Sequence, residues 1–410
     1  MAEPMTNRTE ESRPVGRLPA ALDHLLAPVT VATFVSEYWE KQPLLIQRNQ
    51  PEYYKEILTL EDVDHVLANS SLNDHELRLV ADGEETTLNE LLPGTVEGRI
   101  NGVEALFDRY RSGATVNLMF LNERWPPLSR LCRTLASELS AGIHANVYLT
   151  PPGTRGLTPH HDTHDVLVLH LFGTKHWTYY PTQTRLPLTS QHYVMPAEGA
   201  GEPIQEFELR PGDLAYLPRG TVHAARANEA ASLHLTIGIN PMVWATVVRS
   251  AMEQVFARDT RFRESVPIGF VTSEEVREAS ATWLRELFGI AAAGAHAAEA
   301  IDQAASRMLQ RRHPTLGGHL LDLQRLPSVG LTTRLRRRPD LQYRLTSDDE
   351  QIHIEFHGKV IDLPEYVEDE FAFIAKVNDF VGAEIPGQLD DEGRLVLIRQ
   401  LLREGFLTSA

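Results

Sequence analysis

Two stretches decide the fold: Pro159-His160-His161-Asp162, and RPGDLAYLPRGTVH at 210–223, which ends in His223. Side chains alternate between the two faces of a strand, so His160 and Asp162 are expected on one face and His161 on the other. The Pro-Gly-Asp and Pro-Arg-Gly turns are expected to deliver His223 at the start of a neighbouring strand. Two imidazoles and one carboxylate form the facial triad that holds non-haem Fe(II) and leaves three coordination positions open. The sequence therefore predicts an iron site suited to oxygen chemistry.

Alternatives to this ligand set remain open. His164 has the same parity as His160 and is a second candidate ligand, but it lacks an Asp partner two residues further on. The pair His164-Asp165 is expected to lie behind the ligands or to face the substrate. A cupin that has lost its metal, or a site for another metal, would fit the same residues. A carboxylate ligand leaves no room for a halide on iron, which favours hydroxylation over halogenation.

The ligand charges also indicate a cosubstrate. Two neutral imidazoles and one carboxylate leave Fe(II) with one positive charge, which suits a dianionic 2-oxo acid such as 2-oxoglutarate. Its distal carboxylate needs a cation, and Lys175 follows an expected strand at 166–172 after a Gly-Thr turn. The alternative for Lys175 is a solvated lysine in a hairpin turn. Asn146 and Tyr148 share one strand face and are expected to point inward.

Short strands separated by Gly and Pro dominate the middle of the chain. They are expected at 146–149, 166–172, 176–180, 214–217 and 232–239, after an amphipathic helix at 128–139. Many short strands at this spacing predict a jelly roll or small barrel, and a metal in its mouth is a natural arrangement. The fold class is therefore mixed α+β.

The period changes to helical after residue 240. The first helix is expected at 244–256, and the second begins at the capping signal Thr272-Ser273-Glu274-Glu275 and ends at Gly289. An Ala-rich helix follows at 291–310. The second helix is expected to bury Val276, Ala279, Trp283 and Leu287. Three helices make a thin core, so we expect them to pack on the barrel or against another subunit.

The last eighty residues suggest a separate winged-helix-like unit. A strand at 351–356, a His357-Gly358 turn and a strand at 359–361 precede helices near 365–378 and 391–406. Residues 331–410 hold 10 Lys and Arg against 16 Asp and Glu, a net charge of −6. The basic run at 334–338 is therefore interpreted as a solvated face or local ion pairs, and direct nucleic-acid binding is not expected.

Composition sets the class of protein. The 410 residues carry a net charge of −17, which argues against a phosphate backbone as partner and is compatible with a basic polypeptide. Cys132 is the only cysteine, so no intrachain disulfide can form. Residues 1–17 are polar and are expected to be a disordered leader, and no apolar run is long enough for a membrane span. A cytoplasmic location is expected.

Taken together, these motifs resemble the JmjC-type cupin ribosomal oxygenases. The resemblance is carried by 146–153, 156–162 and 168–177, by the run from Gly212 to His223, by 38–46, and by 397–407. It implies a double-stranded β-helix (JmjC-like cupin) oxygenase domain at 18–240, a helical dimerisation region at 241–325 and a winged-helix-like domain at 326–410. The chain departs from the family at His170, where glutamine is common, and near Gly238, where serine is common.

The resemblance also implies roles for individual residues. It implies that His160, Asp162 and His223 bind Fe(II), that Lys175 and Asn146 bind 2-oxoglutarate, and that Tyr148 faces the substrate. His164 and His170 are further candidates for the substrate side. The implied activity is O2-dependent hydroxylation of an Arg or His side chain in a ribosomal or other basic protein, by a homodimer. Demethylation of an N-methyl group would use the same chemistry. The alternatives are a hydroxylase of peptide natural products or free amino acids, and a metal-free cupin scaffold.

Overall fold

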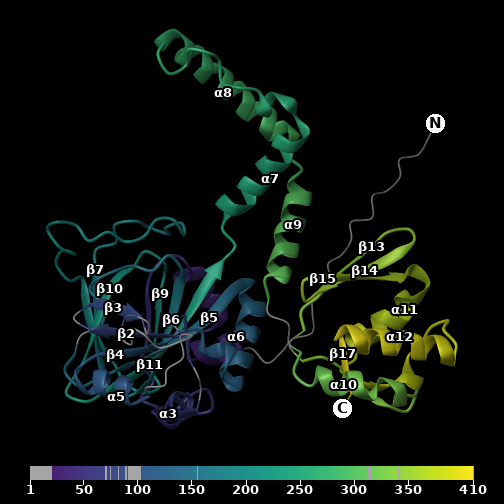
Figure 1. Cartoon of the computed structure of the whole chain (residues 1–410), viewed down its shortest axis with the longest axis horizontal. Coiled ribbons are helices and arrows are strands. Elements are labelled where there is room, and N and C mark those ends of the chain that lie inside the picture. Colours follow the sequence, from purple (N-terminus) through teal and green to yellow (C-terminus); the bar gives the residue numbers. More distant parts are fainter. Residues whose placement is uncertain are drawn as a thin grey trace. The chain divides into compact units, whose positions relative to one another are not determined.

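The computed structural model describes residues 21–409 except 70, 71, 74, 82, 88, 89, 91–102, 155, 313–315 and 340. The leader expected at 1–17 lies outside the described residues. The chain divides into two compact units, one of Ala20–Val243 and one that contains Trp244–Ala410 (Figure 1).

The first unit is built on two antiparallel sheets. One sheet has the order β1-β9-β6-β11-β5-β4-β2-β3, and the other has the order β10-β7-β8. The strands are β1 (Leu44–Ile46), β2 (Leu77–Ala81), β3 (Glu84–Thr87), β4 (Thr115–Leu118), β5 (Ala141–Thr150), β6 (Asp165–Phe172), β7 (Lys175–Tyr180), β8 (Gln205–Leu209), β9 (Leu214–Leu217), β10 (Val222–Ala227) and β11 (Ser232–Pro241). The helices include α1 (Ala21–Leu26), α2 (Val31–Thr33), α3 (Leu60–Asn69), α5 (Val103–Arg111) and α6 (Pro126–Leu139).

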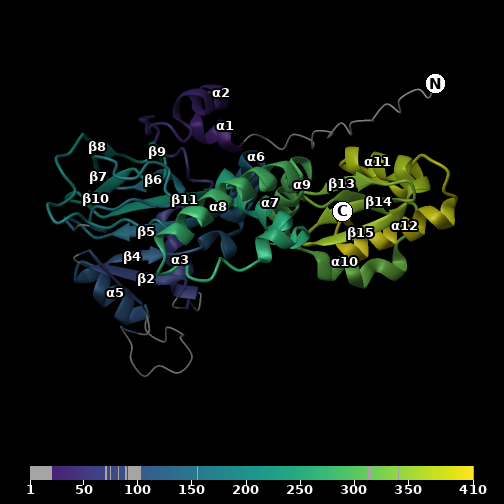
Figure 2. The same cartoon turned by 90° about the horizontal axis from the view of Figure 1, so that it is seen from above.

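This arrangement confirms the strands and the helix expected in the middle of the chain. Helix α6 buries Leu128, Cys132 and Leu135 on one side, as its apolar spacing predicted. Strand β7 alternates buried and half-buried residues, so its buried side faces the space between the sheets. The two sheets thus form the expected cupin-type barrel, seen from a second direction in Figure 2.

The second unit begins with three helices: α7 (Trp244–Arg258), α8 (Glu274–Gly294) and α9 (Ala297–Gln310). The expectation that the second helix ends at Gly289 is wrong, because α8 continues to Gly294. A single interior glycine costs a helix only about 1 kcal/mol, and the good helix formers 291–293 follow it. No helix among the described residues is both long and apolar enough to cross a bilayer.

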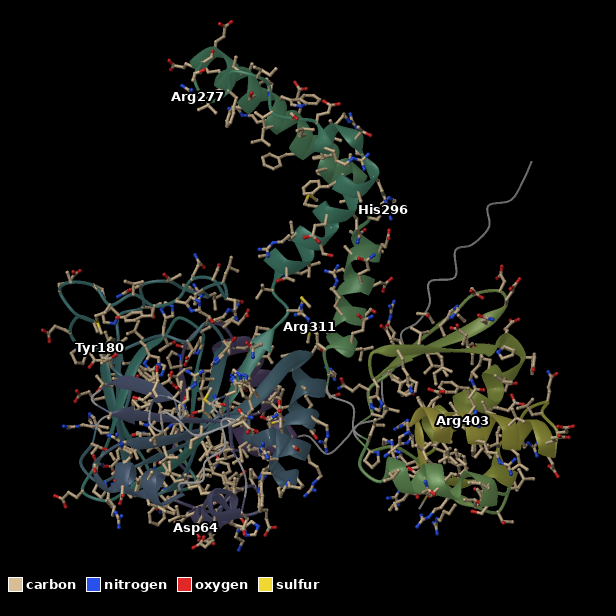
Figure 3. All side chains as sticks on the ribbon, in the orientation of Figure 1. Asp64, Tyr180, Arg277, His296, Arg311 and Arg403 are labelled. Atoms are coloured by element: carbon tan, nitrogen blue, oxygen red, sulfur yellow. The ribbon has the colours of Figure 1, made fainter. Side chains whose placement is uncertain are left out.

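The burial expected along α8 is also wrong. Trp283 is 38% exposed, Ala279 is exposed, and Val276 and Leu287 are only half-buried. Figure 3 shows side chains along α8 beyond the labelled Arg277, and Ala291 is the one residue of this helix that is buried. The apolar spacing was identified correctly, but within the described part of this chain little covers these side chains.

The rest of the second unit has a core of its own, which includes Phe356, Phe371 and Phe406. It is built from α10 (His319–Arg325), α11 (Glu368–Lys376), α12 (Asp391–Glu404) and the strands β12 (Arg334–Arg337), β13 (Arg344–Ser347), β14 (Gln351–Phe356), β15 (Lys359–Pro364), β16 (Asp379–Val381) and β17 (Leu407–Ser409). Its two sheets have the orders β16-β12-β17 and β13-β14-β15. The expected hairpin is β14–β15, and its turn residues His357 and Gly358 both have positive φ, as a type I′ turn requires.

Two arginines of the basic run at 334–338 form local ion pairs, one exposed and one buried. Arg336 forms an exposed ion pair with Asp379, at 3.0 Å. Arg338 is instead 3% exposed and its Nη2 lies 2.8 Å from Oδ2 of Asp322, which is equally buried. A solvated face is therefore wrong for Arg338, because its guanidinium ties α10 to the end of β12 from inside the core.

Candidate metal centre

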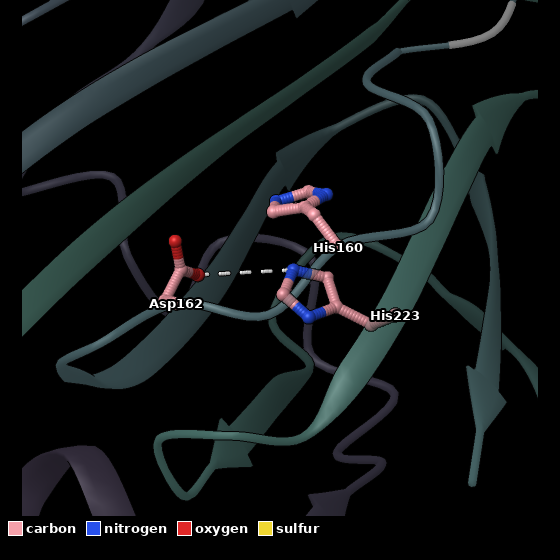
Figure 4. Close-up of side chains that lie close together, drawn as sticks. All are labelled: His160, Asp162 and His223. Carbon is pink, nitrogen blue, oxygen red and sulfur yellow. Dashed lines mark ion pairs between the residues drawn. The ribbon is translucent and has the colours of Figure 1, made fainter. Parts of the chain in front are cut away.

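Three side chains predicted as ligands lie together in the first unit. One ligand atom from each of His160, Asp162 and His223 lies within 4.8 Å of the other two. Figure 4 shows the two imidazoles and the carboxylate converging from the loop before β6 and from the start of β10. His223 Nε2 lies 3.9 Å from Asp162 Oδ2. A spacing wider than a hydrogen bond leaves room for an ion between the groups.

The hydrogen bonds on the far side of both rings fit a metal. His160 Nδ1 lies 2.8 Å from the carbonyl oxygen of Thr158, and His223 Nδ1 lies 2.9 Å from that of Thr221. A carbonyl only accepts, so each Nδ1 carries the hydrogen and each Nε2 presents a lone pair. This is the tautomer that metal-bound histidines adopt when a backbone carbonyl orients them.

The electrostatics favour the same protonation state. Burial, followed by the neighbouring His160, lowers the pKa of His223 to about 4. Burial opposes ionisation of Asp162, but the neighbouring histidines, with His160 and His223 first, together outweigh it and hold the pKa of that carboxyl below its ordinary value. Near neutral pH His223 is therefore neutral and Asp162 is ionised, which are the forms that bind a divalent cation.

The route by which these residues meet differs from the expected one. His160 takes part only in an isolated bridge with His223, and Asp162 lies in the loop before β6. The bridge has two backbone hydrogen bonds between His160 and His223, of 3.1 and 2.8 Å, and Gly220 N donates to Asp162 O at 3.0 Å. Only glycine suits position 220, because its φ is +90° and a Cβ there would lie 2.2 Å from Thr184 O. The side chains that parity selected thus lie together, although no regular strand carries the first pair.

A buried ion pair holds the turn that precedes His223. Arg219 Nη1 lies 2.8 Å from Asp165 Oδ2, and Arg219 also pairs with Glu40. Tyr216 donates its hydroxyl to Asp165 Oδ1 at 3.0 Å. Asp165, the first residue of β6, therefore fixes the Pro-Arg-Gly turn from behind, which agrees with a position behind the ligands.

A cavity of about 260 Å³ connects the predicted cosubstrate residues to the triad. Its lining includes all three candidate ligands together with Asn146, Tyr148 and Lys175. Lys175 is 2% exposed and donates from Nζ to Thr150 Oγ1 at 2.9 Å. Burial lowers the pKa of Lys175 to about 7, and no carboxylate of the described residues forms an ion pair with it. The alternative of a solvated lysine is therefore wrong, and the cavity holds a buried lysine whose ammonium form a bound anion would stabilise.

The remaining predicted residues divide between the cavity and the core. Tyr148 and His164 line the cavity. His170 does not line it: the residue is completely buried, and its Nε2 lies 3.0 Å from Gly173 O. His161 points away, as expected, with Nε2 3.2 Å from Gln191 O.

Two cavity histidines were not assigned from the sequence. His234 stacks on Tyr148 with ring centroids 4.9 Å apart and an interplanar angle of 5°. His144 lies opposite Gly238 on the neighbouring strand, and both histidines line the cavity. The parity rule that selected Asn146 and Tyr148 would also have selected His144, two residues earlier on β5.

Comparison with known proteins agrees with this geometry. Residues 120–247 match the family model of the JmjC domain. Ribosomal oxygenase 2 of Mus musculus is 34% identical over 223 residues, covering 52% of this chain and 46% of the relative. The bifunctional lysine-specific demethylase and histidyl-hydroxylase NO66 of Branchiostoma floridae is 32% identical over 252 residues, covering 59% and 37%. The chain thus spans less than half the length of these curated relatives.

A solved structure extends the likeness in fold. The ribosomal oxygenase YcfD of Escherichia coli superposes with a TM-score of 0.52 at 18% identity, over 93% of this chain and 98% of that one. Residues 120–247 therefore match a JmjC domain, and the chain shares its fold with a ribosomal oxygenase. The resemblance to the JmjC-type cupin ribosomal oxygenases is confirmed. In sequence it covers the JmjC domain at 120–247 and about half of this chain.

Proposed function

We propose that this protein is an Fe(II)- and 2-oxoglutarate-dependent oxygenase that hydroxylates a His or Arg side chain of a ribosomal or other basic protein. In the balanced reaction, a substrate C–H bond, O2 and 2-oxoglutarate give C–OH, succinate and CO2. One oxygen atom enters the substrate and the other enters the new carboxylate of succinate. Ribosomal oxygenases and a histidyl-hydroxylase among the relatives support this class of reaction and substrate.

The observation that carries the proposal is the pairing of two sites in one cavity. His160, Asp162 and His223 would hold the metal, with both imidazoles oriented by backbone carbonyls. The same cavity presents the buried ammonium of Lys175 with no acidic partner among the described residues. A ligand that chelates a metal at one end and carries a second carboxylate at the other satisfies both sites.

Each cavity residue then has a physical task. Bound Fe(II) supplies the electrons and open coordination positions that O2 chemistry needs. Lys175 neutralises the distal carboxylate of 2-oxoglutarate, and Asn146 lies beside the cosubstrate with its Oδ1 fixed by Phe120 N at 3.0 Å. Val166, Val168 and Trp177 line the cavity with apolar surface that excludes water.

The charge of the protein suits a basic substrate. The net charge of −17 attracts a basic polypeptide at long range, and Glu85 adds a carboxylate to the cavity lining. YcfD, which shares the fold, has been crystallised with cobalt and 2-oxoglutarate, which supports the same cosubstrate for this chain.

Mass spectrometry tests the proposal directly. The purified protein is incubated with Fe(II), 2-oxoglutarate and ribosomal proteins from a strain that lacks it. We expect one protein to gain a single oxygen, and we expect equimolar succinate. A metal-free scaffold would bind neither Fe(II) nor Mn(II), and a small-molecule hydroxylase would leave every ribosomal protein unmodified. Either result would refute the proposed function.

The helices α7–α9 are proposed to form a homodimer interface. On α8, Leu284 is 50% exposed and Phe288 is 64% exposed, although soluble helices normally cover such side chains. A second copy of the same helices would bury them. Light scattering should give twice the chain mass, and Phe288→Asp should reduce it to one chain mass.

The last unit, 326–410, is proposed to be a winged-helix-like domain that serves protein architecture. Its hairpin β14–β15 takes the place of a wing, but its segment 331–410 carries a net charge of −6. We expect no retention on double-stranded DNA even at low salt, and salt-sensitive retention would contradict this assignment.

A further inference from the structure

The absence of a side chain at Gly238 shapes one wall of the cavity. Gly238 on β11 lies directly opposite His144 on β5. A Cβ at position 238 would lie 2.2 Å from His144 Cε1 and 2.4 Å from His144 Nε2. The imidazole therefore occupies the volume that any other residue at 238 would need.

That volume is on the cavity side of the sheet. His234 and Thr236 line the cavity, and residue 238 has the same parity along β11. The His144 ring is itself part of the lining. Gly238 thus allows His144 to fold across the neighbouring strand toward the candidate metal centre.

The ring is held in a single orientation by its neighbours. It makes edge contacts with His164, with centroids 4.9 Å apart and an angle of 65°, and it lies 5.7 Å from the ring of Phe120. Asn240 Nδ2 lies 3.2 Å from His144 Nδ1. An amide nitrogen only donates, so Nδ1 accepts and the ring hydrogen is on Nε2. Burial lowers the pKa of His144 to about 4, which agrees with this neutral form.

We propose that His144 determines substrate specificity, because its Nε2–H selects an imidazole over a guanidinium for hydroxylation. A neutral histidine side chain has one ring nitrogen that accepts a hydrogen bond, whereas an arginine side chain has only donors. If the Nε2–H of His144 faced a guanidinium, both donors would lack an acceptor. A site built around one hydrogen bond strongly rejects a substrate that cannot form that bond. This inference rests on the proposed function and narrows its substrate class to histidine.

The test uses two variants that remove the same interaction in different ways. His144→Phe keeps a ring of similar size but has no N–H, and Gly238→Ala adds only the Cβ that would displace the ring. His176→Phe is the matched control, because His176 lies on the other side of β7 from the buried Lys175 and Trp177. Ribosomal proteins are the probe, and peptides spanning the oxidised site give kcat and KM.

We expect the wild-type protein to add oxygen to histidine. Each variant should lower kcat/KM at least about tenfold, mainly through KM, and the double variant should be no worse than His144→Phe alone because both changes remove one contact. The control should stay within twofold. The Kd of the Mn(II)-loaded variants for 2-oxoglutarate should match the wild type, which shows that the rest of the cavity is intact.

The outcomes separate the two proposals. Wild-type oxidation of arginine, or an unchanged kcat/KM in His144→Phe, overturns the inference and leaves the oxygenase assignment standing. If the wild-type protein oxidises no ribosomal protein, the proposed function itself fails.

Discussion

Replacing Lys175 by methionine should stabilise the protein without cosubstrate and weaken its binding of 2-oxoglutarate. Burial lowers the pKa of Lys175 from 10.5 to about 7. This lowered pKa reduces the stability of the folded state by up to about 5 kcal/mol at neutral pH, because each pKa unit corresponds to 1.36 kcal/mol. Methionine removes this cost but leaves Thr150 Oγ1 without its 2.9 Å donor. We therefore expect a net gain of about 1–4 kcal/mol.

The effect on binding has the opposite sign. Without Lys175, the distal carboxylate of 2-oxoglutarate would be buried with no cation, a loss of about 3–5 kcal/mol. At 1.4 kcal/mol for each tenfold, the Kd should rise by roughly 100- to 4,000-fold. Calorimetry on the Mn(II)-loaded protein measures the Kd, and thermal unfolding measures stability, with about 2–4 °C for each kcal/mol in a domain of this size.

The pH dependence checks the cause of the stabilisation. Above about pH 10.5 Lys175 is neutral in both folded and unfolded states, so the variant gains nothing. As the pH falls toward 7, the unfolded chain binds a proton that the folded protein does not, and the gain grows until it levels off below pH 7. Lys55→Met, at an exposed position whose ammonium is 3.9 Å from Glu52, should change neither quantity. A lower melting temperature for Lys175→Met, or a Kd within threefold of wild type, would refute the reasoning.

Three further predictions concern other groups or conditions. Asp162→Ala should abolish succinate formation. It should also weaken Mn(II) binding, measured by titration, by more than the roughly 10- to 100-fold that is typical when a hydrogen bond to a metal ligand is lost. Retained turnover would contradict the assignment of Asp162 as a ligand. Binding of 2-oxoglutarate should take up as much as one proton above pH 7 and none well below it, because the bound carboxylate raises the pKa of Lys175 again. Calorimetry in buffers of different ionisation enthalpy measures this proton uptake. No uptake at pH 8 would count against the pairing of Lys175 with the carboxylate. Asp322→Ala should destabilise the second unit by about 3–5 kcal/mol in urea unfolding, because buried Arg338 loses its ion-pair partner. Asp391→Ala, at an exposed ion pair, should have little effect.

The sequence by itself determined those features that depend on a few neighbouring residues. Alternation along a strand placed Asn146 and Tyr148 on one face, and the turn preference of His357-Gly358 predicted the hairpin. The ligand types at 160, 162 and 223 predicted a candidate metal centre, even though the first pair lies outside the regular strands. Local backbone geometry and side-chain chemistry were sufficient in each case.

Only the tertiary structure decided burial and long-range partners. It showed that Lys175 has no acidic partner among the described residues, that Arg338 is buried against Asp322, and that α8 leaves most of its apolar side chains exposed. It also brought His144 against Gly238, two residues far apart in the chain that meet because β5 pairs with β11. Which segments pair, and which charges are thereby removed from water, is a property of the whole packed chain, so no local pattern encodes it.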